Sequence, residues 1–387
     1  MQARSGLPPL PWLSLVMGLS VANLYYCQAL LPAMASAWGI SADRVLLLPA
    51  VVQWGLAAGL LLLLPLGDAL ERRRMLVVTA LGSGLGCGLL ALAPSFPWAL
   101  AAAAVLGVCS LVTYLLPPFV ALLTAPDRLG AVLGTLLAGQ FAGVLLSRTL
   151  AGALSELQSW RLVYLLAAPL MVLIAIGFQR HLPRQAPQRA ISYRQLQASQ
   201  LQLWRQWPAL RLACLRQGLL FGTFLALWSA LALHLAAPPW GFSPARIGLF
   251  GLVGLFSIVL ARPIGRLVDR QGARSVLLQT AVLAVLALAL LSSASGSLLL
   301  LALGMACLDV AVQGSFVAYQ TLLLSLDPAS RSRMLTWLVF SAYVGAGLCS
   351  LLLHALWPHG QWSVATGLGL VITALALLLL LLPRPQP

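Results

Sequence analysis

Two ionisable side chains stand deep inside long apolar stretches of the chain. Arg148 lies in the stretch near 131–155, and Asp309 lies in the stretch near 297–323. If both stretches are helices, Arg148 is about 25 Å and Asp309 about 21 Å from the arginine-bearing ends of those helices. At this similar depth a carboxylate can carry a proton, and a guanidinium can pair with it or bind an anionic group. A structural role between helices is the alternative for each.

Six neutral side chains at comparable heights in other apolar stretches are further candidates for the same polar site. They are Asn23, Tyr26, Gln28, Gln53, Trp228 and Gln313. Together with Arg148, and with Asp309 as the proton-carrying group, they are predicted to line a substrate cavity. For each neutral side chain alone, packing or a hydrogen bond between helices is the simpler explanation.

Other kinds of chemistry have no matching residue pattern. The six cysteines are scattered through apolar stretches without Cys-x-x-Cys or Cys/His spacing, which indicates small buried residues rather than disulfides or a metal site. His-Glu-x-x-His and Gly-x-Ser-x-Gly motifs do not occur. We therefore expect no metal, no cofactor and no enzymatic activity.

The composition places nearly the whole chain in a membrane. Of its 387 residues, 61% are hydrophobic and 8% are charged, whereas soluble domains carry roughly 25% charged residues. A helix that spans a bilayer needs about 20 apolar residues. Stretches of that size occur twelve times, near residues 10–36, 45–66, 75–94, 98–123, 131–155, 161–179, 209–236, 246–265, 275–293, 297–323, 334–356 and 362–382. The sequence predicts an all-α membrane protein with twelve transmembrane helices.

The basic residues indicate the orientation of these helices. All 23 are arginine; the arginines of the loops gather on one side, and only Arg44, Arg161 and Arg246 fall on the other. Because cytoplasmic loops hold the positive excess, that side is predicted to be cytoplasmic, together with both termini. The net charge of +15 then reflects topology. We expect a monomer in the lipid bilayer and no nucleic-acid partner.

Landmarks of the first half of the chain recur in the second half at a nearly constant offset. The pairs are Trp38-Gly39 with Trp240-Gly241, Asp68 with Asp269, and Trp160 with Trp362. Two six-helix halves in parallel repeat are an architecture of transporters, with the substrate site between the halves. We predict six-helix bundles over 1–180 and 209–387, related by a pseudo-two-fold axis.

The segment 181–208 is predicted to link the bundles in the cytoplasm. It is rich in Gln, Arg and Pro, and an amphipathic helix is expected around Tyr193–Trp207. Its basic, Trp-bearing character would suit the anionic inner leaflet. A solvated linker is the alternative.

The loop after the eighth apolar stretch resembles a family signature. Residues 265–274, Gly-Arg-Leu-Val-Asp-Arg-Gln-Gly-Ala-Arg, resemble the G-x-x-x-D-R-x-G-x-R/K signature of the major facilitator superfamily. The first-half copy, residues 65–74, keeps the Asp and the basic run but has Glu71 at the later Gly position.

In that family the Asp caps a neighbouring helix and pairs with arginines in one transport state. The resemblance therefore implies a conformational latch made of Asp68, Arg72, Arg73, Gly265, Asp269, Arg270, Gly272 and Arg274. Solvated loops that only set the topology are the alternative.

Two further segments resemble the proton-driven drug and sugar efflux branch of this superfamily. Residues 143–152 resemble its antiporter motif G-x-x-x-G-P-x-x-G-G, with Arg148 in place of the proline. Residues 23–32 resemble the Asn-x-Tyr-Tyr-x-Gln-Pro-Leu-Leu-Pro of a subgroup of effluxers, with Ala29 in place of the first proline.

The resemblance implies a proton-coupled exporter of small organic molecules that works by alternating access in a bacterial-type inner membrane. The proton gradient would be its energy source. An importer or uniporter of a small metabolite is the first alternative, and a non-transporting membrane sensor is the second. Apolar lining with one carboxylate would suit cationic or neutral amphiphiles, whereas Arg148 would favour an anionic group. The sequence leaves the charge of the substrate open.

We predict that a cysteine in the linker is reached only from the cytoplasm. An impermeant maleimide should label Ser199→Cys in inverted vesicles and leave it unlabelled in intact cells. The wild-type chain gives the background of the native cysteines. Labelling from the periplasmic side would contradict the predicted topology.

Overall fold

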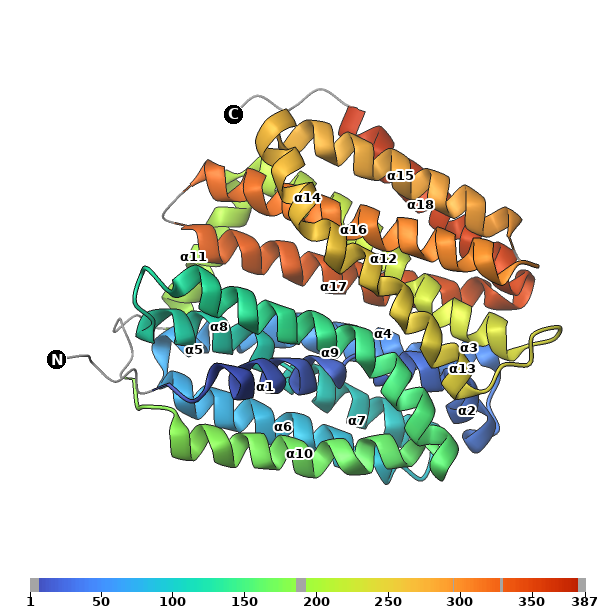
Figure 1. Ribbon diagram of the computed structural model, residues 1–387, viewed down its shortest axis with the longest axis horizontal. Coiled ribbons are helices and arrows are strands. Elements are labelled where there is room, and N and C mark those ends of the chain that lie inside the picture. Colours follow the sequence, from blue (N-terminus) through green and yellow to red (C-terminus); the bar gives the residue numbers. More distant parts are fainter. Residues whose placement is uncertain (1–6, 186–192, 295, 328–329, 382–387) are drawn as a thin grey trace.

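The computed structural model describes residues 7–185, 193–294, 296–327 and 330–381, without the side chains of Asp68, Ala69, Ile258, Ala261 and Arg262. All regular secondary structure in these ranges is helical, and the helices form two groups (Figure 1). The blue-to-green helices up to α10 make the lower group, and the helices from α12 onward make most of the upper group. The predicted all-α architecture of two bundles is confirmed.

Several of the predicted spans in the N-terminal bundle are divided into shorter helices. Breaks at residues 23–25 and 110–111 divide the first and fourth spans, and one residue separates α3 from α4. The helices of this bundle are α1 (Leu10–Ala22), α2 (Tyr26–Trp38), α3 (Ala42–Val45), α4 (Leu47–Leu62), α5 (Leu66–Ala69), α6 (Arg72–Ala91), α7 (Phe96–Cys109), α8 (Val112–Leu123), α9 (Leu129–Leu157) and α10 (Trp160–His181).

After the linker helix α11 (Tyr193–Gln206), the C-terminal bundle has longer continuous helices and one divided span. Its elements are α12 (Pro208–Ala236), α13 (Pro244–Leu249), the 3-10 helix η1 (Phe250–Gly254), α14 (Leu255–Gln271), α15 (Ala273–Ser293), α16 (Leu298–Leu326), α17 (Arg331–Leu356), the 3-10 turn η3 (Trp357–His359) and α18 (Gln361–Leu381). Eleven helical stretches in the described ranges are long and apolar enough to cross a membrane. The eighth predicted span, divided into α13, η1 and α14, completes the twelve.

Glycine spacing accounts for the form of the eighth span. Gly248, Gly251 and Gly254 follow one another every three residues, which is the repeat of a 3-10 helix. They therefore lie on one face of this segment, which is left without side chains. A Cβ at Gly248 would overlap the carbonyl oxygen of Arg148, so α9 and α13 approach each other closely here.

The duplicated Trp-Gly landmark has the same backbone conformation in both halves. Gly39 has φ of +60° and Gly241 has φ of +57°, in the left-handed region that glycine adopts without strain. Both glycines stand where the chain turns after α2 or α12 to enter α3 or α13. We call the end of the molecule that holds these turns the tryptophan end, and the opposite end, with Arg72–Arg74 and α11, the arginine end.

The two bundles are in contact at the tryptophan end. Glu156, at the end of α9, accepts a hydrogen bond from the backbone N–H of Ala245 in α13 at 3.2 Å. His354 of α17 lies with Nδ1 2.7 Å from the carbonyl oxygen of Asp43 and 3.6 Å from its carboxylate. Thr149 donates to the carbonyl oxygen of Gly248 at 2.9 Å. This set of contacts closes the interface between the bundles at this end.

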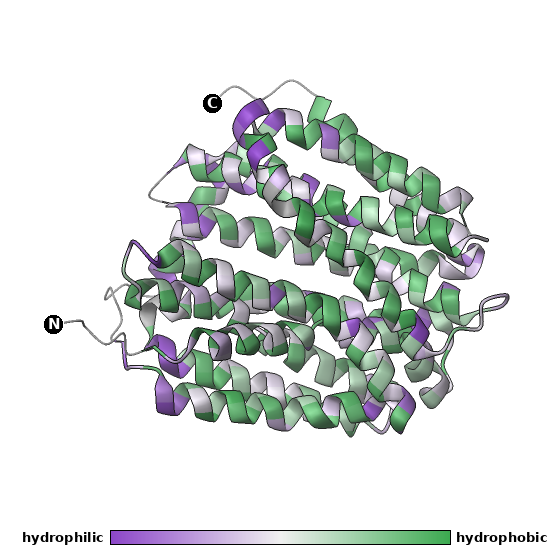
Figure 2. Cartoon of the chain, viewed as in Figure 1, coloured by the Kyte–Doolittle hydropathy of each residue, from purple (hydrophilic) through white to green (hydrophobic). Residues whose placement is uncertain are grey.

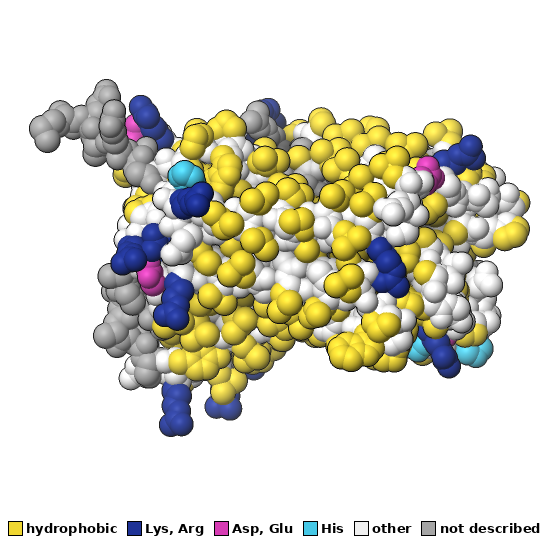
Figure 3. All heavy atoms as spheres, turned by 90° about the horizontal axis from the view of Figure 1, so that it is seen from below, with side chains coloured by type: hydrophobic (Ala, Val, Ile, Leu, Met, Phe, Trp, Pro, Cys, Tyr) yellow, Lys and Arg dark blue, Asp and Glu magenta, His cyan; other side chains and the backbone are white. Residues whose placement is uncertain are grey.

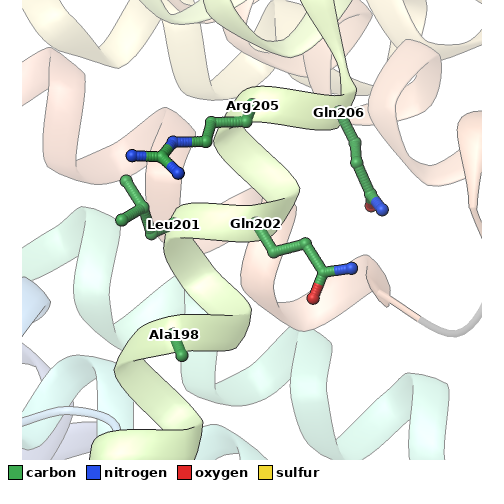
Figure 4. Close-up of a pocket in the computed structure, with 5 residues that line it drawn as sticks. All are labelled: Ala198, Leu201, Gln202, Arg205 and Gln206. Atoms are coloured by element: carbon green, nitrogen blue, oxygen red, sulfur yellow. The ribbon is translucent and has the colours of Figure 1, made fainter.

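The predicted amphipathic helix of the linker is present as α11, and it joins the bundles at the arginine end. Its Tyr193 hydroxyl donates to the carbonyl oxygen of Leu62 at 3.0 Å, and the amide of Gln197 donates to that of Leu61 at 2.9 Å, both at the end of α4. Trp204 packs on Trp337 of α17, with ring centroids 4.6 Å apart. The side chains around the shallow depression on its outer face are drawn in Figure 4: Ala198, Leu201, Gln202, Arg205 and Gln206. α11 therefore uses its tryptophan for packing against the C-terminal bundle.

The surface has the distribution expected of a protein surrounded by lipid. Figure 2 shows hydrophobic residues along the length of the helices, with hydrophilic residues gathered mainly at their ends. In Figure 3 hydrophobic side chains cover the middle of the visible face, and most arginines lie toward its two ends. Large apolar side chains such as Leu299 and Val259 are 77% and 71% exposed. A continuous apolar surface of this size is typical of a protein surrounded by lipid.

We predict that Gly152→Val loosens the tryptophan end. A Cβ at Gly152 would overlap the carbonyl oxygen of Pro244, and backbone cannot rotate away as a side chain can. Overpacking of this kind costs about 1–3 kcal/mol. Chemical crosslinking between Glu156→Cys and Ala245→Cys should therefore fall in the Gly152→Val background.

Gly134→Val is the matched control, because no atom lies within 4 Å of a Cβ at Gly134 on the same helix. It should leave crosslinking at the wild-type level. Equal crosslinking in both backgrounds would show that α9 and α13 do not depend on this close approach.

Candidate functional site

Arg148 lies inside the molecule where the two bundles meet. It is carried by α9 and is only 5% exposed. Its Nε donates to Oε1 of Gln28 on α2 at 2.8 Å. The ring of Trp228 on α12 lies 4.2 Å from the guanidinium carbon, and the ring of Tyr25 lies 5.4 Å from it. Two aromatic faces and one amide therefore surround the positive charge.

Three N–H donors of this cluster have no hydrogen-bond partner among the described residues. They are Nη2 of Arg148, Nε2 of Gln28 and Nε1 of Trp228. Two come from the N-terminal bundle and one from the C-terminal bundle. Buried polar groups are normally paired, so the surroundings of Arg148 are rich in donors and short of acceptors.

Asp309 lies beside η1, as Arg148 does. It is 6% exposed, and the hydroxyl of Ser257 lies 2.8 Å from its Oδ2. A Cβ at Gly254 would be 3.2 Å from this oxygen, and a Cβ at Gly251 would be 3.2 Å from the Cβ of Arg148. The two ionisable residues, which belong to α9 and α16, thus lie against the same short segment of η1.

The suggested direct pairing of Arg148 with Asp309 is not present. The described residues hold no ion pair between them within 4.0 Å. Each group has a different hydrogen-bond partner instead: Arg148 donates to Gln28, and Ser257 donates to the carboxylate of Asp309. Each group keeps its own set of neighbours.

Three tyrosine hydroxyls connect the bundles beside Arg148. Tyr114 of α8 donates to the hydroxyl of Tyr343 on α17 at 2.9 Å. The hydroxyl of Tyr25 is 3.4 Å from the same Tyr343 oxygen. Because the ring of Tyr25 also faces the guanidinium, this cluster links the positions of α1, α8 and α17 to the site.

The other four predicted cavity residues are Asn23, Tyr26, Gln53 and Gln313. Asn23 donates to Ser83 of α6 at 3.4 Å, and Tyr26 packs on Tyr164 of α10, with ring centroids 6.1 Å apart. Both therefore face the interior of the N-terminal bundle. Gln53 is 1% exposed, and neither polar atom of its amide has a partner among the described residues. Gln313 is half-buried on α16, one turn beyond Asp309 and on the same face.

Four residues of the site were not predicted from the sequence: Tyr25, Tyr114, Ser257 and Tyr343. Tyr25 adjoins the predicted Tyr26, and a helix turns by about 100° per residue. The break between α1 and α2 decides which of the two tyrosines faces the other bundle. Ser257 could have been found as a polar residue within the apolar eighth span.

In the first copy of the signature loop, the predicted latch residues hold local structure. The side chain of Asp68 lies outside the described residues. Arg72 donates to the carbonyl oxygen of Gly67 at 3.2 Å. Arg73 lies 3.4 Å from the Glu71 carboxylate and donates to the carbonyl oxygens of Gln179 and Leu182 at the end of α10. Arg73 thus caps a helix of its own bundle.

In the second copy the predicted latch is not engaged within the described part of the chain. Asp269, Arg270 and Arg274 are exposed, and Asp269 has no hydrogen bond or ion pair with another described residue. Gly265 has no atom within 4 Å of an added Cβ. Gly272 has φ of +81° at the turn from α14 to α15, which requires glycine. The latch role of this loop stays a prediction.

Among the described residues, no group of three His, Cys, Asp or Glu side chains is placed to hold a metal ion. The six cysteines are free and are dispersed over several helices. The chemistry of the site is therefore that of the charged, amide and aromatic side chains described above.

Two six-span bundles with charged residues enclosed between them define a membrane transport protein. Residues 13–240 match the Major Facilitator Superfamily, and the chain belongs to this family.

Similar proteins support this assignment along most of the chain. The uncharacterized transporter YgaY of Escherichia coli O157:H7 is 35% identical over 351 residues, which is 91% of this chain and 89% of the relative. The transporter SCO4007 of Streptomyces coelicolor is 34% identical over 354 residues, 91% of this chain and 82% of the relative. A crystal structure of a variant of the nucleoside transporter NupG shares the fold, with a TM-score of 0.77 at 14% identity, and the match covers 96% of this chain and 99% of that one.

We predict that Tyr343→Phe destabilises the protein and that Tyr164→Phe does not. Tyr343→Phe leaves the buried hydroxyls of Tyr25 and Tyr114 without their partner, at a cost of about 1–3 kcal/mol. The hydroxyl of Tyr164 is buried and has no partner among the described residues, so its removal should be neutral or stabilising. Thermal unfolding in detergent, followed by size-exclusion chromatography, should show a lower midpoint for Tyr343→Phe alone. Equal midpoints in the two variants would show that the tyrosine cluster contributes no net stability.

Proposed function

We propose that this protein exports a small organic molecule across a bacterial-type inner membrane in exchange for protons, by alternating access. The observation that carries the proposal is the placement of Arg148 and Asp309 beside η1, both buried where the bundles meet. Ionisable residues inside a membrane span are rare and mark substrate or proton pathways. In this proposal Asp309 carries the proton, and both termini and α11 face the cytoplasm.

The surroundings of Asp309 suit a group that changes its protonation during transport. Burial penalises the charged carboxylate, whereas the Ser257 hydroxyl at 2.8 Å and the positive charge of Arg148 favour it. A conformational change that alters either influence would release or take up the proton.

The contacts between the bundles support alternating access. The tryptophan end is closed by Glu156, by His354 with Asp43, and by the glycine contact of α9 with α13. The arginine end is joined through α11. Polar contacts of this kind near the surface are worth about 1 kcal/mol or less each. These polar contacts alone therefore present only a small barrier to the opening of either end.

The direction of transport rests on the resemblance of residues 143–152 and 23–32 to the efflux branch of the superfamily. The donor-rich surroundings of Arg148 favour a second candidate. In that candidate an anionic substrate enters the cell together with protons, because a bound anion at Arg148 would favour protonated Asp309.

Vesicles of opposite orientation separate these candidates. Everted vesicles energised by respiration have an acidic lumen, and an exchanged substrate added outside should discharge the gradient, seen as dequenching of a pH-sensitive dye. A co-transported substrate should leave the dye quenched and should instead be taken up with protons by right-side-out vesicles. Failure of a broad compound panel in both assays would contradict proton-coupled transport.

We predict that Asp309→Asn abolishes uphill transport but retains downhill exchange. The amide cannot carry a proton, whereas it keeps the volume of the carboxylate and can still contact Ser257. Accumulation of substrate against its gradient should therefore be lost, while counterflow across vesicles without a proton gradient should persist. Asp127→Asn is the control, because this carboxylate is 75% exposed beside Arg128. Uphill transport by Asp309→Asn would assign the residue to structure and place coupling elsewhere.

A further inference from the structure

Several arginines of this protein donate hydrogen bonds to backbone carbonyl oxygens. Arg161 donates to the carbonyl oxygens of Ala91 and Ala93, and Arg73 donates to those of Gln179 and Leu182. Arg72, Arg216 and Arg331 likewise donate to backbone carbonyl oxygens. These arginines satisfy the ends of helices and turns, which is a structural role.

Arg148 differs from all of these. Its recorded hydrogen bond goes to a side-chain amide, and its Nη2 has no partner among the described residues. It forms no ion pair with a described carboxylate, although it is 5% exposed. A buried charge without a counter-charge is costly, and a protein retains it when a ligand supplies the missing charge.

We propose that the transported substrate carries an anionic group, a carboxylate or another oxyanion, and that Arg148, Gln28 and Trp228 bind it. This inference rests on the proposed transport function, names the substrate class of the same site, and supports the second candidate, in which an anion enters together with protons. The unpartnered Nη2, Nε2 and Nε1 atoms are all donors, and only an acceptor can satisfy them together. The guanidinium would repel a cation, and the three unpartnered atoms offer no acceptor to a hydrogen-bond donor.

The placement of the donors gives the anion a role in transport. Arg148 and Gln28 belong to the N-terminal bundle, whereas Trp228 belongs to the C-terminal bundle. An oxyanion held by all three would draw α2, α9 and α12 together, so it would bind best when the bundles are closed around it. The rings of Trp228 and Tyr25 flank the guanidinium, which suits a planar or apolar body beside the charged group.

The test measures equilibrium binding to the full-length protein in lipid nanodiscs without any ion gradient. The probes are three pairs of matched size that differ in charge: benzoate and benzamide, nicotinate and nicotinamide, hexanoate and hexanamide. Tryptophan fluorescence reports binding, and ligand-induced thermal stabilisation checks it. Charge-assisted hydrogen bonds should make at least one carboxylate bind about 10- to 100-fold more tightly than its amide.

Substitutions assign the preference to the site. Arg148→Gln should remove the difference between carboxylate and amide, and Arg148→Lys should retain part of it. Arg161→Gln is the matched control, since Arg161 also lies over a tryptophan, 4.6 Å from the ring of Trp160, but outside the site. It should keep the wild-type preference. Trp228→Phe keeps an aromatic ring and removes one donor, so it should weaken carboxylate binding. This variant tests the site independently of whether Arg148→Gln folds.

Three outcomes would overturn the proposal: equal binding of each carboxylate and its amide, binding of no carboxylate, or a carboxylate preference that survives Arg148→Gln. Where Arg148→Gln does not fold, carboxylate binding that is unchanged by Trp228→Phe replaces the third outcome. Because no gradient is applied, the result is independent of proton coupling. A protein that binds anions but moves no protons would refute the proposed function and keep this inference.

Discussion

The rest of this structure depends on one constraint, which is a guanidinium buried inside a protein that is itself surrounded by lipid. Hydrocarbon offers no hydrogen-bond partner, so a charge at this depth must be enclosed by protein. Here the enclosure is built from both bundles, with Gln28 and Tyr25 on one side and Trp228 on the other. If the bundles separated beside Arg148, its guanidinium would lose its contact with Trp228 of the C-terminal bundle. The electrostatics of one residue are thereby tied to the relative position of the two halves.

The same physics explains how much of the fold could be predicted from the sequence. Apolar stretches of spanning length and the one-sided arginines determine the number and order of helices, because lipid penalises every alternative. The interruptions were harder to foresee. Residues 23–25 and η1 break helices inside stretches that are apolar enough overall to span the membrane as one helix. The spacing of Gly248, Gly251 and Gly254 is related to the break at η1, but it can be interpreted only when the close approach of α9 is known.

For the site, residue identity was predictable and orientation was not. Arg148 and Asp309 could be chosen because ionisable groups in apolar stretches are costly and rare. Neutral candidates lack that signal, and a helical position differs from its neighbour by about 100°. Tyr26 therefore points into its own bundle while Tyr25 reaches Tyr343 of the other. The linker helix shows the same limit, since a tryptophan suited to a lipid surface packs instead on Trp337.

Arg148 and Asp309 lie beside η1 with separate partners, and this placement ties the charge of the substrate to the sign of coupling. A cation and a proton would compete for Asp309, because each neutralises the same negative charge, and competition of this kind gives exchange. An anion at Arg148 removes the positive charge that favours ionised Asp309, so anion binding and protonation would favour each other. Linkage makes this effect reciprocal, and mutual enhancement gives co-transport. Since the two residues form no ion pair within the described structure, neither ligand has to break one before it binds. The chemistry around Arg148 therefore determines whether this architecture exchanges its substrate for protons or moves both in the same direction.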